Sequence, residues 1–162
     1  MTSHAQGRWQ VELHRQLPLL GHRNWIVIAD SAYPWQTAPG IETLYADADQ
    51  LDVLKLVLQQ LSQSKHVKPI IYTDAELKFV PEKRAPGISA FREQLGQQLP
   101  KQAAQELPHE QIIAKLDEAG KTFKILLIKT RLTLPYTSVF LQLDCAYWDA
   151  DAEKELRAAM TR

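Results

Sequence analysis

Apolar residues follow two different spacings along the chain, which predicts alternating helices and strands. An apolar position at every third or fourth residue indicates helices over residues 9–20 and about 51–61. Short apolar stretches indicate strands at 25–29, 41–46, 67–73, 123–129 and 137–143. The stretch 25–29 is apolar throughout, which is typical of a central strand covered on both faces.

The rest of the chain adds three more expected helices. Residues 74–108 are the least regular part, with four prolines around one expected helix at 89–98. Pro108 suits the first turn of a further helix that runs to about residue 119, and a charged helix is expected at about 149–160. The alternation predicts an α/β protein. Because the sequence shows no repeat, low-complexity tract or long linker, a single domain over 1–162 is expected.

Composition and charge narrow the class of partner. The chain has 162 residues, and its 19 basic residues balance 19 acidic ones at a pI near 7.0. This balance argues against nucleic acid or an anionic membrane surface as the main partner, because both attract a basic excess. A lone Cys145 makes neither an intrachain disulfide nor a four-ligand zinc site. Without a signal-like or membrane-length apolar run, a cytoplasmic protein is expected.

Few residues are candidates for chemistry. Asp30 follows the strand at 25–29, and the ends of such strands are where α/β sheets bind ligands, although an aspartate there can also simply stabilise its own turn. His22 lies between a helix and a strand, and His109 lies in the first turn of an expected helix; both could also be ordinary surface residues. No nucleophile elbow, phosphate loop, dinucleotide fingerprint or histidine pair at metal-ligand spacing occurs.

Four segments in order resemble one family. They are Leu-Gly-His-Arg-Asn at 20–24, Ala-Asp-Ser-Ala-Tyr-Pro at 29–34, Pro-His-Glu-Gln at 108–111 and Pro-Tyr-Thr-Ser at 135–138. No single segment is specific, but each lies at an expected element boundary. Together they resemble the RbsD/FucU family, whose characterised members are D-ribose pyranase and L-fucose mutarotase.

The resemblance implies a fold, an assembly and a set of roles. It implies a three-layer α/β domain, with a central mostly parallel or mixed sheet between helices, in homo-oligomers whose sites form between subunits. It implies no cofactor and no metal. His22 matches the family's proton-donor histidine and would be catalytic. Asp30, His109 and Tyr136 match sugar-binding positions, and Ser138 stands where the family has asparagine.

These residue types suit the opening of a sugar ring. A base removes the proton of the anomeric hydroxyl while an acid protonates the ring oxygen, and a histidine can serve in either role near neutral pH. An extended strand would separate His22 from Asp30 by roughly 20–26 Å. One small sugar therefore cannot contact both in one chain unless a loop folds back, whereas a site shared between subunits removes the difficulty.

Three functions remain open at this point. The first is a sugar isomerase of the mutarotase or pyranase type. The second is a non-catalytic protein that binds a sugar or related metabolite, favoured by Ser138 in place of asparagine and by Ile113 where the pyranase branch often has lysine. The third is an enzyme with different chemistry on a related polyol or carbonyl compound.

Overall fold

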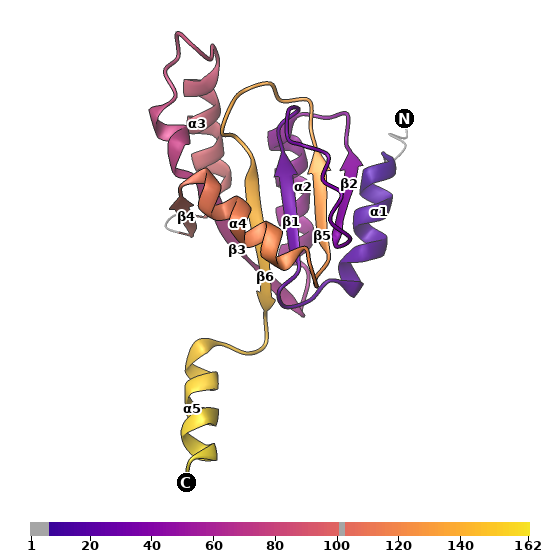
Figure 1. The fold of residues 1–162 in the computed structure, drawn as a ribbon, viewed down its shortest axis with the longest axis vertical. Coiled ribbons are helices and arrows are strands. Elements are labelled where there is room, and N and C mark those ends of the chain that lie inside the picture. The colour runs from indigo at the N-terminus through magenta and orange to yellow at the C-terminus, as the bar shows by residue number, and fades with distance from the viewer. Residues whose placement is uncertain (1–6, 101–102) are drawn as a thin grey trace.

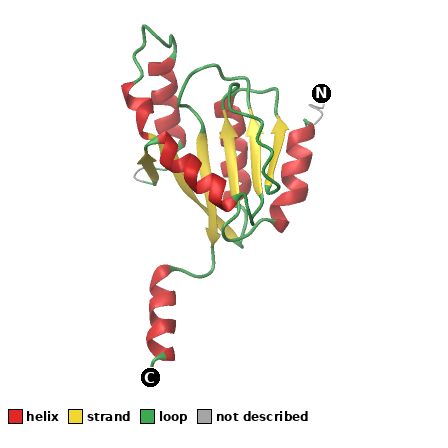
Figure 2. Ribbon diagram, in the orientation of Figure 1, coloured by secondary structure: helices red, strands yellow, loops and turns green. Residues whose placement is uncertain are grey.

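The computed structural model describes residues 7–100 and 103–162, which form a mixed sheet with helices packed against it (Figures 1 and 2). Within these ranges the six strands are β1 Trp25–Ala29, β2 Ile41–Tyr45, β3 Val67–Asp74, β4 Ala104–Leu107, β5 Ile125–Lys129 and β6 Val139–Cys145. The α-helices are α1 Arg8–Gln16, α2 Gln50–Ser62, α3 Ile88–Gln98, α4 His109–Ala119 and α5 Ala150–Met160, and two 3-10 helices are η1 Leu17–Leu19 and η2 Ala75–Phe79.

The strand order decides which loops meet. The sheet runs β2-β5-β1-β6-β3-β4, and its pairs are parallel except where β6 lies antiparallel between β1 and β3. The carboxyl ends of the five other strands therefore share one edge of the sheet with the amino end of β6. The opposite edge carries the amino end of β1 and the carboxyl end of β6. The α/β class and the mixed sheet expected from the sequence are confirmed.

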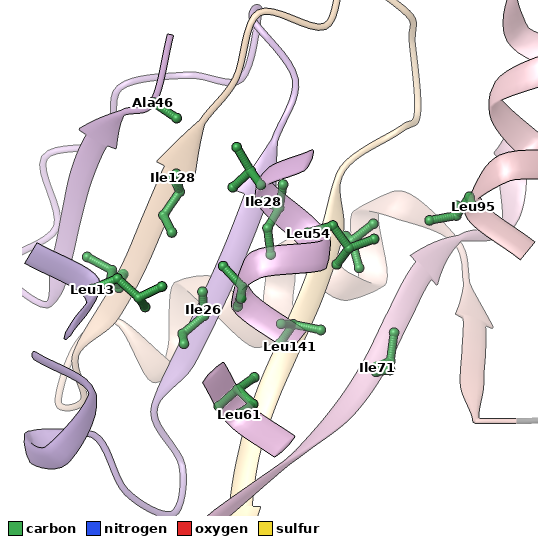
Figure 3. Packing of buried hydrophobic residues seen from close by; sticks show 14 of the residues in the cluster. Leu13, Ile26, Ile28, Ala46, Leu54, Leu61, Ile71, Leu95, Ile128 and Leu141 are labelled. Atoms are coloured by element: carbon green, nitrogen blue, oxygen red, sulfur yellow. The ribbon is translucent and has the colours of Figure 1, made fainter. Parts of the chain in front are cut away.

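Both faces of the sheet are buried, as the apolar run of β1 predicts. Ile26 and Ile28 point to one face, where they pack in the cluster drawn in Figure 3 with residues of α1, α2 and α3. Trp25 and Val27 point to the other face, which α4 covers. Leu54 of α2 is fully buried in the first cluster, and replacing such a leucine with alanine costs about 2–5 kcal/mol.

The predicted elements match the observed ones closely, with a few differences. The helix expected at 9–20 ends early and continues as the tighter η1, because Pro18 lacks the N–H that an α-helix would use. The short strand β4 and the 3-10 helix η2 lie within the stretch expected to be irregular. The C-terminal helix forms as α5 but extends away from the sheet and buries none of its residues (Figure 1).

None of the helices within residues 7–100 and 103–162 combines the length and the apolar character needed to cross a lipid bilayer.

Candidate functional site

The carboxyl edge of the sheet brings Asp30 and Ser138 together. Asp30 follows β1 and Ser138 precedes β6, its antiparallel neighbour, so the two residues lie side by side. The hydroxyl of Ser138 donates to Oδ1 of Asp30 at 2.7 Å, and the backbone N–H of Asp30 donates to Oγ of Ser138 at 3.1 Å. This pair of hydrogen bonds fixes the orientation of the Asp30 carboxylate.

A histidine–aspartate pair lies at the same edge. His109 begins α4, and its Nδ1 is 2.9 Å from Oδ1 of Asp74, the last residue of β3. Its backbone N–H also donates to both carboxylate oxygens of Glu76 at 3.0 Å. Because carboxylates accept, Nδ1 carries the proton, which leaves Nε2 as the nitrogen that can contact a ligand.

Asp74 has an unusual environment for a carboxylate. Its side chain is 1% exposed, and among the described residues its Oδ2 has no hydrogen-bond partner. Burial raises the pKa of Asp74 to about 6, although the hydrogen bond and charge of His109 oppose the shift. The nearby charges of Glu76 and Asp30 raise this pKa further. Asp74 therefore titrates close to neutral pH at the edge where the sequence places candidate ligand-binding residues.

Tyr136 completes this group. Its ring packs edge-on against His109, with 5.7 Å between the ring centroids, and its side chain is partly exposed. Its backbone adopts φ 57°, in the left-handed region that a bulky residue rarely occupies. Strain of this kind costs energy and is often found at functional sites. The loop before β6 thus holds the aromatic ring of Tyr136 beside the His109 imidazole.

Asp30 and Asp74 lie close enough to a buried tyrosine, Tyr33, for their charges to affect its pKa. Burial raises the pKa of Tyr33, and the charges of Asp117, Asp74 and Asp30 add to that shift. Within residues 7–100 and 103–162 the hydroxyl of Tyr33 has no hydrogen-bond partner. The ring of Phe140 lies 6.5 Å from that of Tyr33 and 6.4 Å from that of His109. Asp30 and Asp74 therefore belong to a single acidic region, packed around an aromatic core.

A tight turn presents His22 at the opposite edge. The backbone N–H of Asn24 donates to the carbonyl of Gly21, and Arg23 takes φ 76°, the positive value that this kind of turn requires. The side chain of Asn24 stabilises the turn by accepting from the Gly21 N–H and donating to the carbonyl of Lys124. The Gly-His-Arg-Asn sequence thus leaves His22 at the exposed corner of the turn.

His22 also pairs with a carboxylate. Its Nδ1 is 2.9 Å from Oδ1 of Asp144, near the end of β6, and its side chain is 58% exposed. Both residues line a cavity of about 560 Å³ beside the start of α5. Asp144 accepts the Nδ1 proton, so the second nitrogen, Nε2, is available to exchange a proton with a bound molecule. This arrangement suits general acid–base chemistry.

The structure separates the sequence-predicted residues into two groups. Asp30 and Ser138 form one hydrogen-bonded pair and His109 and Tyr136 one aromatic pair, all at the carboxyl edge. His22 lies at the other edge, because a whole strand runs between it and Asp30. Within the described ranges no group of three or more histidine, cysteine or acidic side chains is arranged to hold a metal ion.

Sequence reasoning missed both aspartates that pair with these histidines. Asp74 had a usable signal, since it ends the strand at 67–74 in the same way that Asp30 follows the strand at 25–29. Asp144 had none, because it reaches His22 only through the antiparallel placement of β6 beside β1. A single sequence does not specify that pairing.

Comparisons with known proteins point to one family. Residues 6–145 match the model of the RbsD / FucU transport protein family. Bacillus subtilis RbsD complexed with D-ribose is 22% identical, has a TM-score of 0.59, and the match covers 89% of this chain and 98% of that one. The Streptococcus pneumoniae fucose mutarotase in complex with L-fucose is 18% identical, with a TM-score of 0.56 and coverage of 88% and 97%.

Bifidobacterium longum FucU is 17% identical, with a TM-score of 0.52 and coverage of 83% of this chain and 94% of that chain. At these identities the structural likeness concerns the fold. Among curated proteins, none matches the chain in sequence.

Proposed function

Because the chain belongs to the RbsD/FucU family, we propose that it interconverts the anomers or ring forms of a free monosaccharide, with His22 as the catalytic acid and base. The relatives with bound ribose and fucose support a monosaccharide as the ligand. The reaction uses protein side chains alone and needs no cofactor.

The His22–Asp144 pair supplies the proton transfer. In ring opening, Nε2 of His22 takes the proton of the anomeric hydroxyl and then delivers it to the ring oxygen, and ring closure on either face reverses these transfers. Asp144 accepts the Nδ1 proton of His22 at 2.9 Å, which orients the ring and stabilises the imidazolium that forms when Nε2 takes a second proton.

The carboxyl-edge group supplies sugar binding. Ser138 fixes the Asp30 carboxylate, whose remaining lone pairs accept hydrogen bonds from sugar hydroxyls. His109 offers Nε2 and Tyr136 offers a hydroxyl to the same ligand. Since these residues and His22 lie at opposite edges of one sheet, the complete site is formed by the carboxyl edge of one subunit against the His22 edge of its neighbour.

The observation that carries the proposal is the His22–Asp144 pair beside its cavity. The test is saturation-difference NMR on pentoses and hexoses, with D-ribose and L-fucose as the first two. Wild type should accelerate exchange between sugar forms and His22→Ala should abolish the acceleration, whereas His14→Ala, a substitution of an exposed histidine on α1, should behave like wild type. A His22→Ala variant as active as wild type would overturn the assignment.

One observation favours a second function, a sugar-binding protein without turnover. The side chain of Ser138 is short, and both its hydroxyl proton and one of its lone pairs are already used by Asp30. It therefore offers a sugar less than the asparagine found at this position in the family. Calorimetric binding of a sugar, together with no acceleration of exchange in the correctly assembled protein, would select this function.

A further inference from the structure

We propose that Trp148 forms a wall of the His22 cavity and binds the apolar face of a sugar ring. The inference rests on the proposed function and extends it to a residue outside the segment that matches the family, which ends at residue 145. Trp148 lies in the connection between β6 and α5. The C-terminal extension would thus contribute directly to the specificity of this site.

The cavity itself places Trp148 next to the catalytic histidine. The residues that line it come from the turn before β1, the end of β6 and the start of the extension: His22, Asp144, Cys145, Trp148, Asp149, Ala150 and Glu153. A volume of about 560 Å³ is within the range of pockets that bind small molecules. His22 and Trp148 therefore face the same cavity, and a ligand bound there can contact both residues.

The indole is held in place from its polar side. Its Nε1–H donates to Oε2 of Glu153 at 2.7 Å, and Oε1 of the same carboxylate accepts from Nε of Arg157 at 2.7 Å. Because the only polar group of the indole is already used, Trp148 can offer a ligand only apolar ring surface. A fixed aromatic side chain loses little conformational entropy when a ligand binds, which favours affinity.

The chemistry around the indole suits an uncharged sugar. A pyranose ring presents C–H groups on its faces and hydroxyl groups at its rim. An aromatic surface packs well against the C–H groups, and the carboxylates of Asp144 and Glu153 can accept hydrogen bonds from the hydroxyl groups. The same carboxylates, joined by Asp149, repel an anionic ligand such as a sugar phosphate.

Other exposed aromatic residues do not share these features. Tyr147 is the neighbour of Trp148 in the chain and is 76% exposed, compared with 45% for Trp148, and it does not line the cavity. It therefore provides a matched control, because its substitution removes an aromatic side chain from the same connection without changing the cavity wall.

The test measures exchange rates against sugar concentration for wild type, Trp148→Ala, Trp148→Phe and Tyr147→Ala, with the sugar that wild type exchanges fastest. Trp148→Ala should raise KM about tenfold with little change in kcat, since it removes binding surface but leaves the His22–Asp144 pair. Trp148→Phe should keep most of the affinity, and Tyr147→Ala should match wild type. An unchanged KM for Trp148→Ala, or an equal rise for Tyr147→Ala, would overturn the inference.

Failure of the proposed function would give a different pattern. If wild type accelerates no exchange, calorimetric titration of the same four proteins with D-ribose and L-fucose replaces the kinetic assay. A loss of affinity confined to Trp148→Ala would still support the aromatic wall in a binding protein. Equal affinities in all four proteins, or no binding to wild type, would overturn it.

Discussion

Asp74 makes the stability of the protein depend on pH in an unusual direction. Its pKa is raised from 3.8 to about 6 because its side chain is buried. At pH values between 3.8 and about 6, the Asp74 carboxyl has lost its proton in the unfolded chain but still holds it in the folded chain. The stability that Asp74 contributes through this proton is therefore fully present below pH 3.8 and is lost as pH rises through about 6. We expect Asp74→Asn to remove this dependence.

The magnitude follows from the size of the shift. A rise of about two pKa units corresponds to about 3 kcal/mol between the two limits. From about pH 4.5 to about pH 7.5, a range that is practical for unfolding experiments, the Asp74 carboxylate should lower the free energy of unfolding by about 2 kcal/mol. The buried amide of Asp74→Asn also lowers the free energy of unfolding, but this effect does not depend on pH. It therefore shifts the whole stability profile of the variant without changing how stability varies with pH.

The assay is urea unfolding of wild type and Asp74→Asn at a series of pH values and one fixed protomer concentration, since assembly also affects apparent stability. The stability of the variant relative to wild type should increase by about 2 kcal/mol from the acidic to the neutral end. Titratable groups that do not interact with Asp74 ionise alike in both proteins and cancel in the difference. Parallel profiles would refute the reasoning, because they would mean that Asp74 ionises normally in the folded protein.

Two further substitutions test the His22–Asp144 pair and the close packing around Gly40. Asp144→Asn should lower kcat by roughly tenfold to a hundredfold with little change in KM, because Asp144 is the partner that orients His22 and stabilises its charged form. An unchanged kcat in the NMR exchange assay would show that Asp144 takes no part in catalysis. Gly40→Ala should lower the melting temperature by more than 5 °C, since a Cβ there would overlap the carbonyl oxygens of Gly120 and Phe123, and a melting temperature equal to wild type would contradict this packing.

The fold was largely predictable from local patterns. The strand at 25–29 is apolar at every position because both of its faces are covered, and the structure places β1 at those five residues. Strand β4 was missed because it is a short strand at the edge of the described sheet, paired with β3, and its burial does not alternate between its two faces. The start of α4 was predictable from Pro108, which suits the beginning of a helix.

The site was only partly predictable, because much of it depends on strand order. The positions of His22 and Asp30 at opposite ends of one strand could be deduced from an eight-residue separation. The pairing of His22 with Asp144 depends on β6 lying antiparallel to β1, which local sequence does not encode. The same is true of Trp148, whose place in the cavity follows from how the chain leaves β6.

A complementation experiment tests the central claim most directly. His22→Ala and His109→Ala chains, each inactive in exchange assays when assembled alone, are co-expressed in equal amounts, and mixed assemblies are identified by native mass spectrometry. If each site combines His22 of one subunit with His109 of its neighbour, about a quarter of the sites in random mixtures contain both histidines, so activity should return to about that fraction of wild type. Mixed assemblies with no recovered activity, or a fully active wild-type monomer, would contradict the shared site.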